Sequence, residues 1–157
     1  MNIIFDINDY DKKNIFFLEA KQNIIMNGKF TKILYSNLDI TTIGLFFKIH
    51  FNNSVIHNVN NKNILKFEKN HHNNQLIYML SKLETDILEN YNNLYNCKKQ
   101  FSTILSDFLM YGNIKLYMKE RNDNSNLLYI IKISGVWENE KEIGINYKFL
   151  EVNEITK

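Results

Sequence analysis

The chain has 157 residues, 45% of them hydrophobic and 13% aromatic, which is enough apolar side chain for one folded domain over residues 1–157 and excludes a disordered chain. The formal net charge is only +2, which excludes a protein that coats duplex DNA by charge alone. A nucleic-acid binder of this composition would have to gather its lysines on one face. Cys97 is the only cysteine, which excludes an internal disulfide and a cysteine-based zinc site and favours a reducing compartment.

The beginning of the chain, MNIIFDINDYDKKN, mixes acidic residues with apolar ones, which is not the pattern of a signal peptide. No window approaches the roughly 20 apolar residues that a membrane-spanning helix needs. The sequence therefore predicts a soluble, cytoplasmic protein with no membrane partner.

Residues 1–67 are expected to form short strands, because apolar runs alternate with polar breaks. The expected strands cover 3–5, 15–17, 30–35, 44–51, 55–59 and 64–67. The run 44–51 has the period of two that is typical of a half-buried strand. It predicts Leu45, Phe47 and Ile49 on one face, and Phe46 and Lys48 on the other.

Two helices are expected next, over about 74–96 and 99–111. The first is indicated by Leu76, Leu80, Leu83, Ile87 and Tyr91, which recur at steps of three and four. Its acidic residues are expected on the solvent side: Glu84, Asp86 and Glu89. The second helix is expected to stop at Gly112–Asn113, which is a typical C-terminal pair.

The remainder, residues 114–152, predicts a three-stranded antiparallel meander with strands near 114–118, 127–137 and 143–152. The pattern as a whole is α+β. It favours a small antiparallel sheet, closed or half-closed like a barrel, with the two helices as an insertion before the meander.

Catalytic motifs are absent, because the chain has no phosphate-binding glycine loop, dinucleotide fingerprint or nucleophile elbow. His71 and His72 are adjacent, so their side chains diverge, and we expect them in a solvated loop. His50 and His57 could meet across a hairpin, but no third metal ligand is evident. We therefore expect a protein that is not an enzyme and that has no cofactor and no metal.

Single-stranded nucleic acid is held by positive charge together with aromatic rings on which bases stack. The strand 114–118 carries this pattern, because its apolar residues alternate with Lys115, Tyr117 and Lys119. Trp137 is left open between a core ring and a stacking platform. The full candidate set is Phe46, Lys48, Lys115, Tyr117, Lys119, Lys132, Trp137 and Lys148.

The stretch IKISGVWENEKEIGINYKF, residues 131–149, resembles a strand-turn-strand signature in small uncharacterised proteins of large DNA viruses. Proteins of this size in such viruses and in cytoplasmic linear plasmids include single-stranded DNA-binding proteins, often built on an OB-type barrel. The resemblance implies an OB-type fold, a role in viral or plasmid DNA replication, and a location in the host cytoplasm or a viral factory. The C-terminal residues 151–157 are too short and too mixed in charge to act as the acidic recruiting tail of phage-type binders.

The alternative function is a structural or interaction protein of a large DNA virus, either a virion component or a modulator of a host partner. The helix stripe could pair with a partner helix, and exposed strand edges make a homo-oligomer plausible with either function. The distribution of lysines separates the two functions. If Lys115, Lys119, Lys132 and Lys148 lie on one face, nucleic acid is favoured, and if they scatter over different faces, the alternative is favoured.

Overall fold

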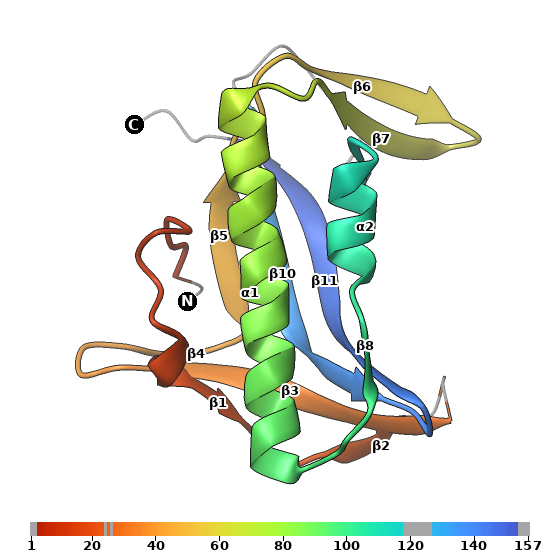
Figure 1. Ribbon diagram of the computed structural model, residues 1–157. Helices are drawn as coiled ribbons and strands as arrows, with labels where there is room; N and C mark the ends of the chain where they lie inside the picture. The colour runs from red at the N-terminus through yellow and green to blue at the C-terminus, as the bar shows by residue number, and fades with distance from the viewer. Residues whose placement is uncertain (1–2, 24, 26, 118–126, 154–157) are drawn as a thin grey trace.

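The computed structural model (Figure 1) describes residues 3–23, 25, 27–117 and 127–153. Its helices are α1 (His71–Tyr95), α2 (Ile104–Met110) and a short 3-10 helix, η1 (Lys12–Asn14). Its strands are β1 (Ile15–Phe17), β2 (Lys21–Asn23), β3 (Gly28–Ser36), β4 (Thr41–Ile43), β5 (Leu45–Ile49), β6 (Ser54–Val59), β7 (Lys62–Phe67), β8 (Gln100–Ser102), β9 (Asn113–Tyr117), β10 (Leu127–Glu138) and β11 (Glu142–Asn153).

The long hairpin of β10 and β11 forms the centre of one large, mostly antiparallel sheet. Along the edge of β10 that faces away from β11, residues 129–133 pair with β5 and residues 135–138 pair with β3. On the other side, β11 pairs in parallel with β8 at one end and with β9 at the other. The order along the sheet is β1-β3-β10-β11-β9-β7-β6, and the two end strands do not pair with each other. The sheet is therefore open.

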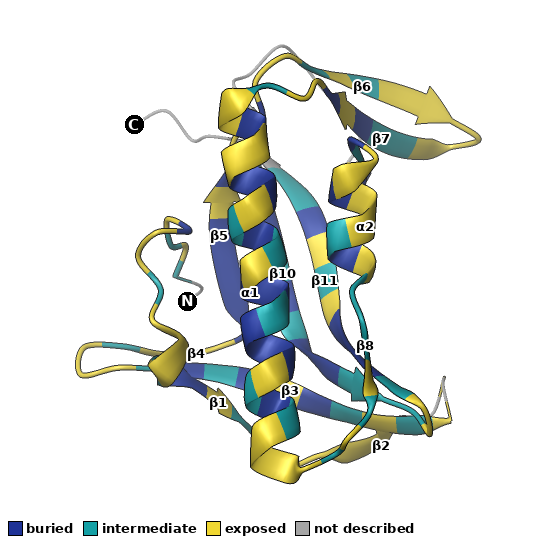
Figure 2. Ribbon diagram, viewed as in Figure 1, coloured by how far each residue is buried: buried dark blue, intermediate teal, exposed yellow. Residues whose placement is uncertain are grey.

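Helix α1 lies along the sheet, and α2 lies beside it on the same side (Figure 1). The N-terminal cap of α1 is Asn70, whose side chain accepts a hydrogen bond from the backbone N–H of Asn73. The helix ends at Asn96, which has the left-handed conformation typical of a helix C-terminus. Buried positions run the length of α1 on the side that faces the sheet (Figure 2). This helix face and the sheet side chains beneath it, including Phe47, Ile131 and Phe149, form the core.

A β-bulge interrupts β10 between Ile133 and Gly135. Before the bulge, Ile131 and Ile133 face the helices, and side chains alternate between the two sides of the sheet. The extra residue shifts that alternation by one, so that Val136 and Glu138 face the helices after it. Trp137 is thereby turned to the opposite side of the sheet, where Lys132 also lies.

The structure confirms the predicted α+β class, with two helices and a remainder that is rich in strands. A closed OB-type barrel is not confirmed, because the sheet is open. The expected meander of residues 114–152 is wrong in its order, because β9 pairs with β11 and not with β10. The outer side of β10 is already occupied by β5 and β3, so β9 has only the free side of β11 to join.

The second helix is shorter than the expected 99–111, because residues Gln100–Ser102 join the sheet as β8. His71 and His72 open α1 and do not form the expected loop. His50 and His57, which could have met across a hairpin, do not pair. The backbone carbonyl of His50 instead lies 2.8 Å from His72 Nε2, and His57 pairs with Ile64 across the β6–β7 hairpin.

Candidate nucleic-acid interface

The side of the sheet that faces away from α1 and α2 carries lysines and aromatic rings on its central strands. Directly paired residues share one side of a sheet, so the register places the members. We call this surface the open face. The lysines and aromatic residues on its central strands are Phe30, Lys32, Phe46, Lys48, Lys115, Tyr117, Lys132, Trp137 and Lys148.

Lys132 and Lys148 are direct cross-strand partners in the β10–β11 hairpin. Like charges in directly opposite positions destabilise a sheet. The Lys132 ammonium lies 5.5 Å from the ring centroid of Phe46, its partner on β5, in a cation–π contact. Phe46 was expected to be an exposed ring, and this is wrong, because only 6% of it is exposed. Its place on the open face is to support Lys132.

Trp137 is the partner of Gly144 on β11, and its indole lies against that glycine. A Cβ added to Gly144 would lie 2.3 Å from the indole ring, so only glycine leaves room for it. Phe30 lies in the same way over Gly135 on the neighbouring strands. Trp137, left open between a core ring and a stacking platform, is half-buried on the open face and does not belong to the core, and its role as a stacking platform stays a prediction.

Tyr117 lies between two lysines at the other end of the open face. The ammonium of Lys115 is 5.0 Å from the Tyr117 ring centroid, and that of Lys148 is 5.1 Å from the same centroid. Tyr117 itself is 44% exposed. Both lysines are exposed, and neither forms an ion pair with another residue in the described ranges. The group of one ring and two cations is therefore accessible to an anionic ligand.

Acidic residues are scarce on the open face. In the described strands, Glu142 at the start of β11 is the one acidic residue with the open-face alternation. The other described acidic residues lie in the N-terminal segment, on α1 and α2, on the helix side of the hairpin (Glu138 and Glu151), and in loops (Glu19, Asp39, Glu68 and Glu140). The open face therefore carries a local excess of positive charge, although other lysines, such as Lys13, Lys82 and Lys98, are exposed elsewhere.

Glu84 of α1 was expected to face solvent, and this is wrong, because it is fully buried. Its carboxylate accepts hydrogen bonds from the backbone N–H groups of Leu105 (3.1 Å) and Ser106 (2.9 Å) and from the Ser106 hydroxyl. Thr103 provides no side-chain cap, so Glu84 serves as the cap of α2 from a neighbouring helix. Burial raises the pKa of Glu84, although the hydrogen bonds from Ser106 and Leu105 oppose the rise.

Asp86 is also buried, contrary to expectation. Its carboxylate accepts a hydrogen bond from the Tyr10 hydroxyl at 3.1 Å and lies 3.8 Å from the Lys12 ammonium. Burial, followed by the charge of Asp86, raises the pKa of Tyr10 far above its ordinary value. These contacts fasten the N-terminal segment to α1 and account for both buried carboxylates as structural groups.

Glu138 lies one residue beyond the expected strand 127–137, but in the structure it ends β10 and faces α1. It accepts hydrogen bonds from Lys99 Nζ at 2.6 Å and from the Tyr91 hydroxyl at 2.8 Å. Burial alone would raise the pKa of Glu138, but the hydrogen bonds from Lys99 and Tyr91 outweigh it and hold the pKa below the ordinary value.

Of the sequence candidates, the structure places Lys48, Lys115, Tyr117, Lys132, Trp137 and Lys148 together on the open face. Lys119 lies outside the described residues. The sequence reasoning missed Phe30 and Lys32. Their alternation with buried Thr31 and Ile33 is visible in the sequence, but only the pairing of β3 with β10 shows that they adjoin Trp137.

Within the described residues, no three histidine, cysteine or acidic side chains are grouped as metal ligands require. No described helix is long and apolar enough to cross a membrane. No protein-family model, curated protein or solved structure matches the chain.

Proposed function

We propose that this protein binds single-stranded DNA without sequence specificity, in viral or plasmid DNA replication, and that the open face is its binding surface. The observation that carries the proposal is the grouping of Lys115, Lys132 and Lys148 with Tyr117 and Trp137 on one side of the sheet. Had Lys115, Lys132 and Lys148 lain on different faces, a structural protein would have been favoured instead.

The arrangement suits a single strand for a physical reason. A sheet backed by helices on one side, with rings and cations on the other, offers stacking platforms and phosphate contacts together. Each stacked base contributes about 1–3 kcal/mol, so tight binding does not need a large net charge. Such a surface needs an accessible sheet face and does not need a closed barrel.

The electrostatic cost of the surface supports the proposal as well. Lys132 and Lys148 face each other across the hairpin, and Lys148 also shares the Tyr117 ring with Lys115. Folding brings these cations together, and a phosphate backbone would relieve their repulsion by neutralising them. The repulsion is thus a stability cost that binding offsets.

A fluorescence-polarisation titration with a labelled oligothymidine tests the proposal. A variant that replaces Lys115, Lys132 and Lys148 with Gln should bind far more weakly than the wild type. The matched control replaces Lys13, Lys82 and Lys98, which are exposed on η1, α1 and the loop after α1, and it changes the net charge equally. Equal weakening by both variants would show that total charge, and not the open face, governs binding.

One observation favours the alternative, a structural or interaction protein. Phe16, Leu34 and Ile43 are directly paired across β1, β3 and β4, and Phe16 and Ile43 are about half exposed. An apolar row of this kind is typical of a contact surface between proteins. Sizing chromatography of the wild type and of Ile43→Ser tests whether the row holds two copies together. A wild type that elutes as a monomer at every concentration would contradict self-association.

A further inference from the structure

A pocket of about 180 Å³ opens where β9 and β11 separate. Strand β11 pairs with β8 over residues 142–144 and with β9 over residues 149–150, so residues 145–148 between them pair with β10 alone. The lining residues come from both sides of the sheet. Lys115, Tyr117 and Lys148 belong to the open face, whereas Ile114, Tyr147, Phe149 and Phe108 of α2 belong to the helix side.

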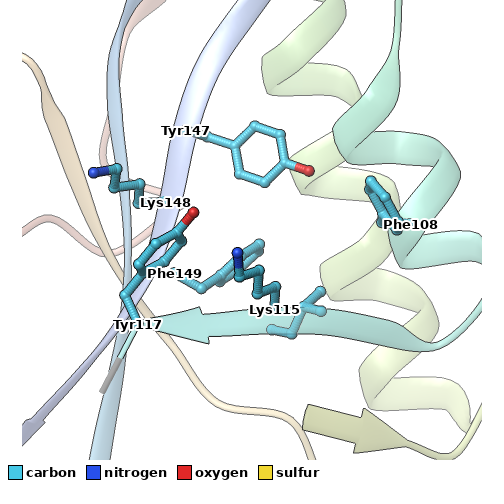
Figure 3. A pocket seen from close by; sticks show the side chains of 7 residues that line it. Phe108, Lys115, Tyr117, Tyr147, Lys148 and Phe149 are labelled. Atoms are coloured by element: carbon cyan, nitrogen blue, oxygen red, sulfur yellow. The ribbon is translucent and has the colours of Figure 1, made fainter. Parts of the chain in front are cut away.

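The pocket is lined by four aromatic rings, of which Phe149 is fully buried, and by two exposed lysines, Lys115 and Lys148. Tyr147 and Phe149 form an edge-to-face pair with centroids 5.9 Å apart. Figure 3 shows the Tyr147 ring pointing toward Phe108 and the Lys148 side chain pointing the opposite way. Burial raises the pKa of Tyr147 to about 12, so its hydroxyl remains protonated near neutral pH and can donate a hydrogen bond.

We propose that this pocket receives one unstacked base of the bound strand, while Lys115 and Lys148 hold the adjoining phosphate. The inference rests on the proposed function and adds to it an anchoring site for a single nucleotide. Tyr117 would stack against the strand, and the Tyr147 hydroxyl would donate to a carbonyl oxygen or ring nitrogen of the base.

Three features fit this ligand better than other classes. The volume is below the 300 Å³ or more that is typical of sites for drug-sized ligands, so the pocket suits a single ring system. An uncharged apolar ligand would leave the two ammonium groups without a role. A simple anion would leave the aromatic rings without a role, whereas a nucleotide uses both.

The test compares thymidine 5′-monophosphate with 2-deoxyribose 5-phosphate, which keeps the phosphate and lacks the base, in ligand-observed NMR titrations of the full chain. The wild type should bind the nucleotide at least about fivefold more tightly, because one stacked base contributes at least that factor. Phe108→Ala should remove most of this preference. Phe108 is 51% exposed, and the matched control is Tyr111→Ala at the end of the same helix, which is 80% exposed and does not line the pocket.

Tyr147→Phe keeps the ring and removes only the hydroxyl, so it provides a second, conservative variant that should weaken the nucleotide severalfold. Oligothymidine binding is measured on the same samples. If oligothymidine binds but the two small ligands bind equally, or if Phe108→Ala and Tyr147→Phe match the wild type, the pocket does not hold a base and the open-face function stands. If oligothymidine does not bind to the wild type, the proposed function is overturned, and the pocket inference with it.

Discussion

At the scale of single residues, repulsion between neighbouring lysines of the open face lowers the stability of the fold. Lys148 faces Lys132 across the hairpin and shares the Tyr117 ring with Lys115. Replacing Lys148 with Thr, which suits a strand, removes its repulsion with Lys132 and Lys115 and also its contact with the Tyr117 ring, which Lys115 retains. We expect the lost repulsion to outweigh the lost contact, so that the free energy of unfolding rises by at most about 1 kcal/mol. The same variant should bind oligothymidine more weakly. Urea denaturation and polarisation titration measure the two effects. A variant that loses both stability and binding would contradict the claim that Lys148 lowers stability while it favours binding.

Gly144 is a second residue whose identity the surface requires. A Cβ at this position would overlap the Trp137 indole, so Gly144→Ala must displace the ring. We expect a loss of about 1–3 kcal/mol in stability, as is typical of overpacking, together with a shift in the emission of the single tryptophan and weaker DNA binding. Gly112→Ala is a poor control because Gly112 has a positive φ, so Ser134→Ala in the bulge serves instead. An unchanged emission spectrum in Gly144→Ala would show that the indole does not lie on the glycine.

The lowered pKa of Glu138 predicts how the stability of the fold depends on pH. Its pKa in the folded state is held below the ordinary value of 4.5, so it contributes stability that is present above that value and is lost as the pH falls through the folded-state pKa. Glu138→Gln lacks this contribution. The gap in stability between wild type and variant should therefore narrow when urea denaturation is repeated from about pH 7 down to about pH 3. A gap that stays constant or widens over this range would contradict the interaction of Glu138 with Lys99.

Alternation along a strand predicted most of the candidate residues, because the period of two places Lys115 and Tyr117 on one side without knowledge of the partner strands. It failed to decide Trp137, because the bulge before Gly135 reverses the alternation, and Gly135 signals an irregular strand without showing to which side the following side chains turn. It was wrong about the exposure of Phe46, because a side chain on the open face can still be covered by its neighbours.

At the scale of elements, the two helices are joined through one carboxylate. Glu84 of α1 caps α2, so Glu84→Ala leaves the N–H groups of Leu105 and Ser106 and the Ser106 hydroxyl without this acceptor. We expect a loss of about 1–3 kcal/mol in the free energy of unfolding, which is the cost of unsatisfied buried donors. Glu89→Ala, an exposed position on the same helix, should change stability by less than about 0.5 kcal/mol. Equal effects of the two substitutions in urea denaturation would contradict the cap.

The period of the leucines predicted α1 well, since a stripe at steps of three and four needs no knowledge of the rest of the fold. The acidic residues were misplaced because the buried side of α1 is broader than that stripe. Leu76 and Tyr91 lie on it as expected, but so do Glu84 and Asp86, which α2 and the N-terminal segment cover. Burial by a partner distant in sequence has no local pattern.

At the scale of the whole molecule, the sheet order could not be predicted. Each strand from β9 to β11 was expected to pair with the next, because consecutive strands commonly do. The structure instead inserts β11 between β10 and β9, and this order creates the separation of β9 from β11 where the pocket lies. Whether the sheet closes into a barrel likewise depends on pairing between strands that are far apart in the sequence. The helices cover one side, and Lys48, Lys115, Lys132 and Lys148 lie on the other.

The most direct test of the account is the titration of labelled oligothymidine with wild-type protein at increasing salt. The account predicts binding at low salt, about 20 mM, with log K falling by about 0.7 for each phosphate contacted per log unit of salt. It also predicts that binding is lost when Lys115, Lys132 and Lys148 become Gln and is retained when Lys13, Lys82 and Lys98 do. Absence of binding by the wild type at about 50 μM protein and low salt, where the electrostatic attraction is strongest, would contradict the central claim.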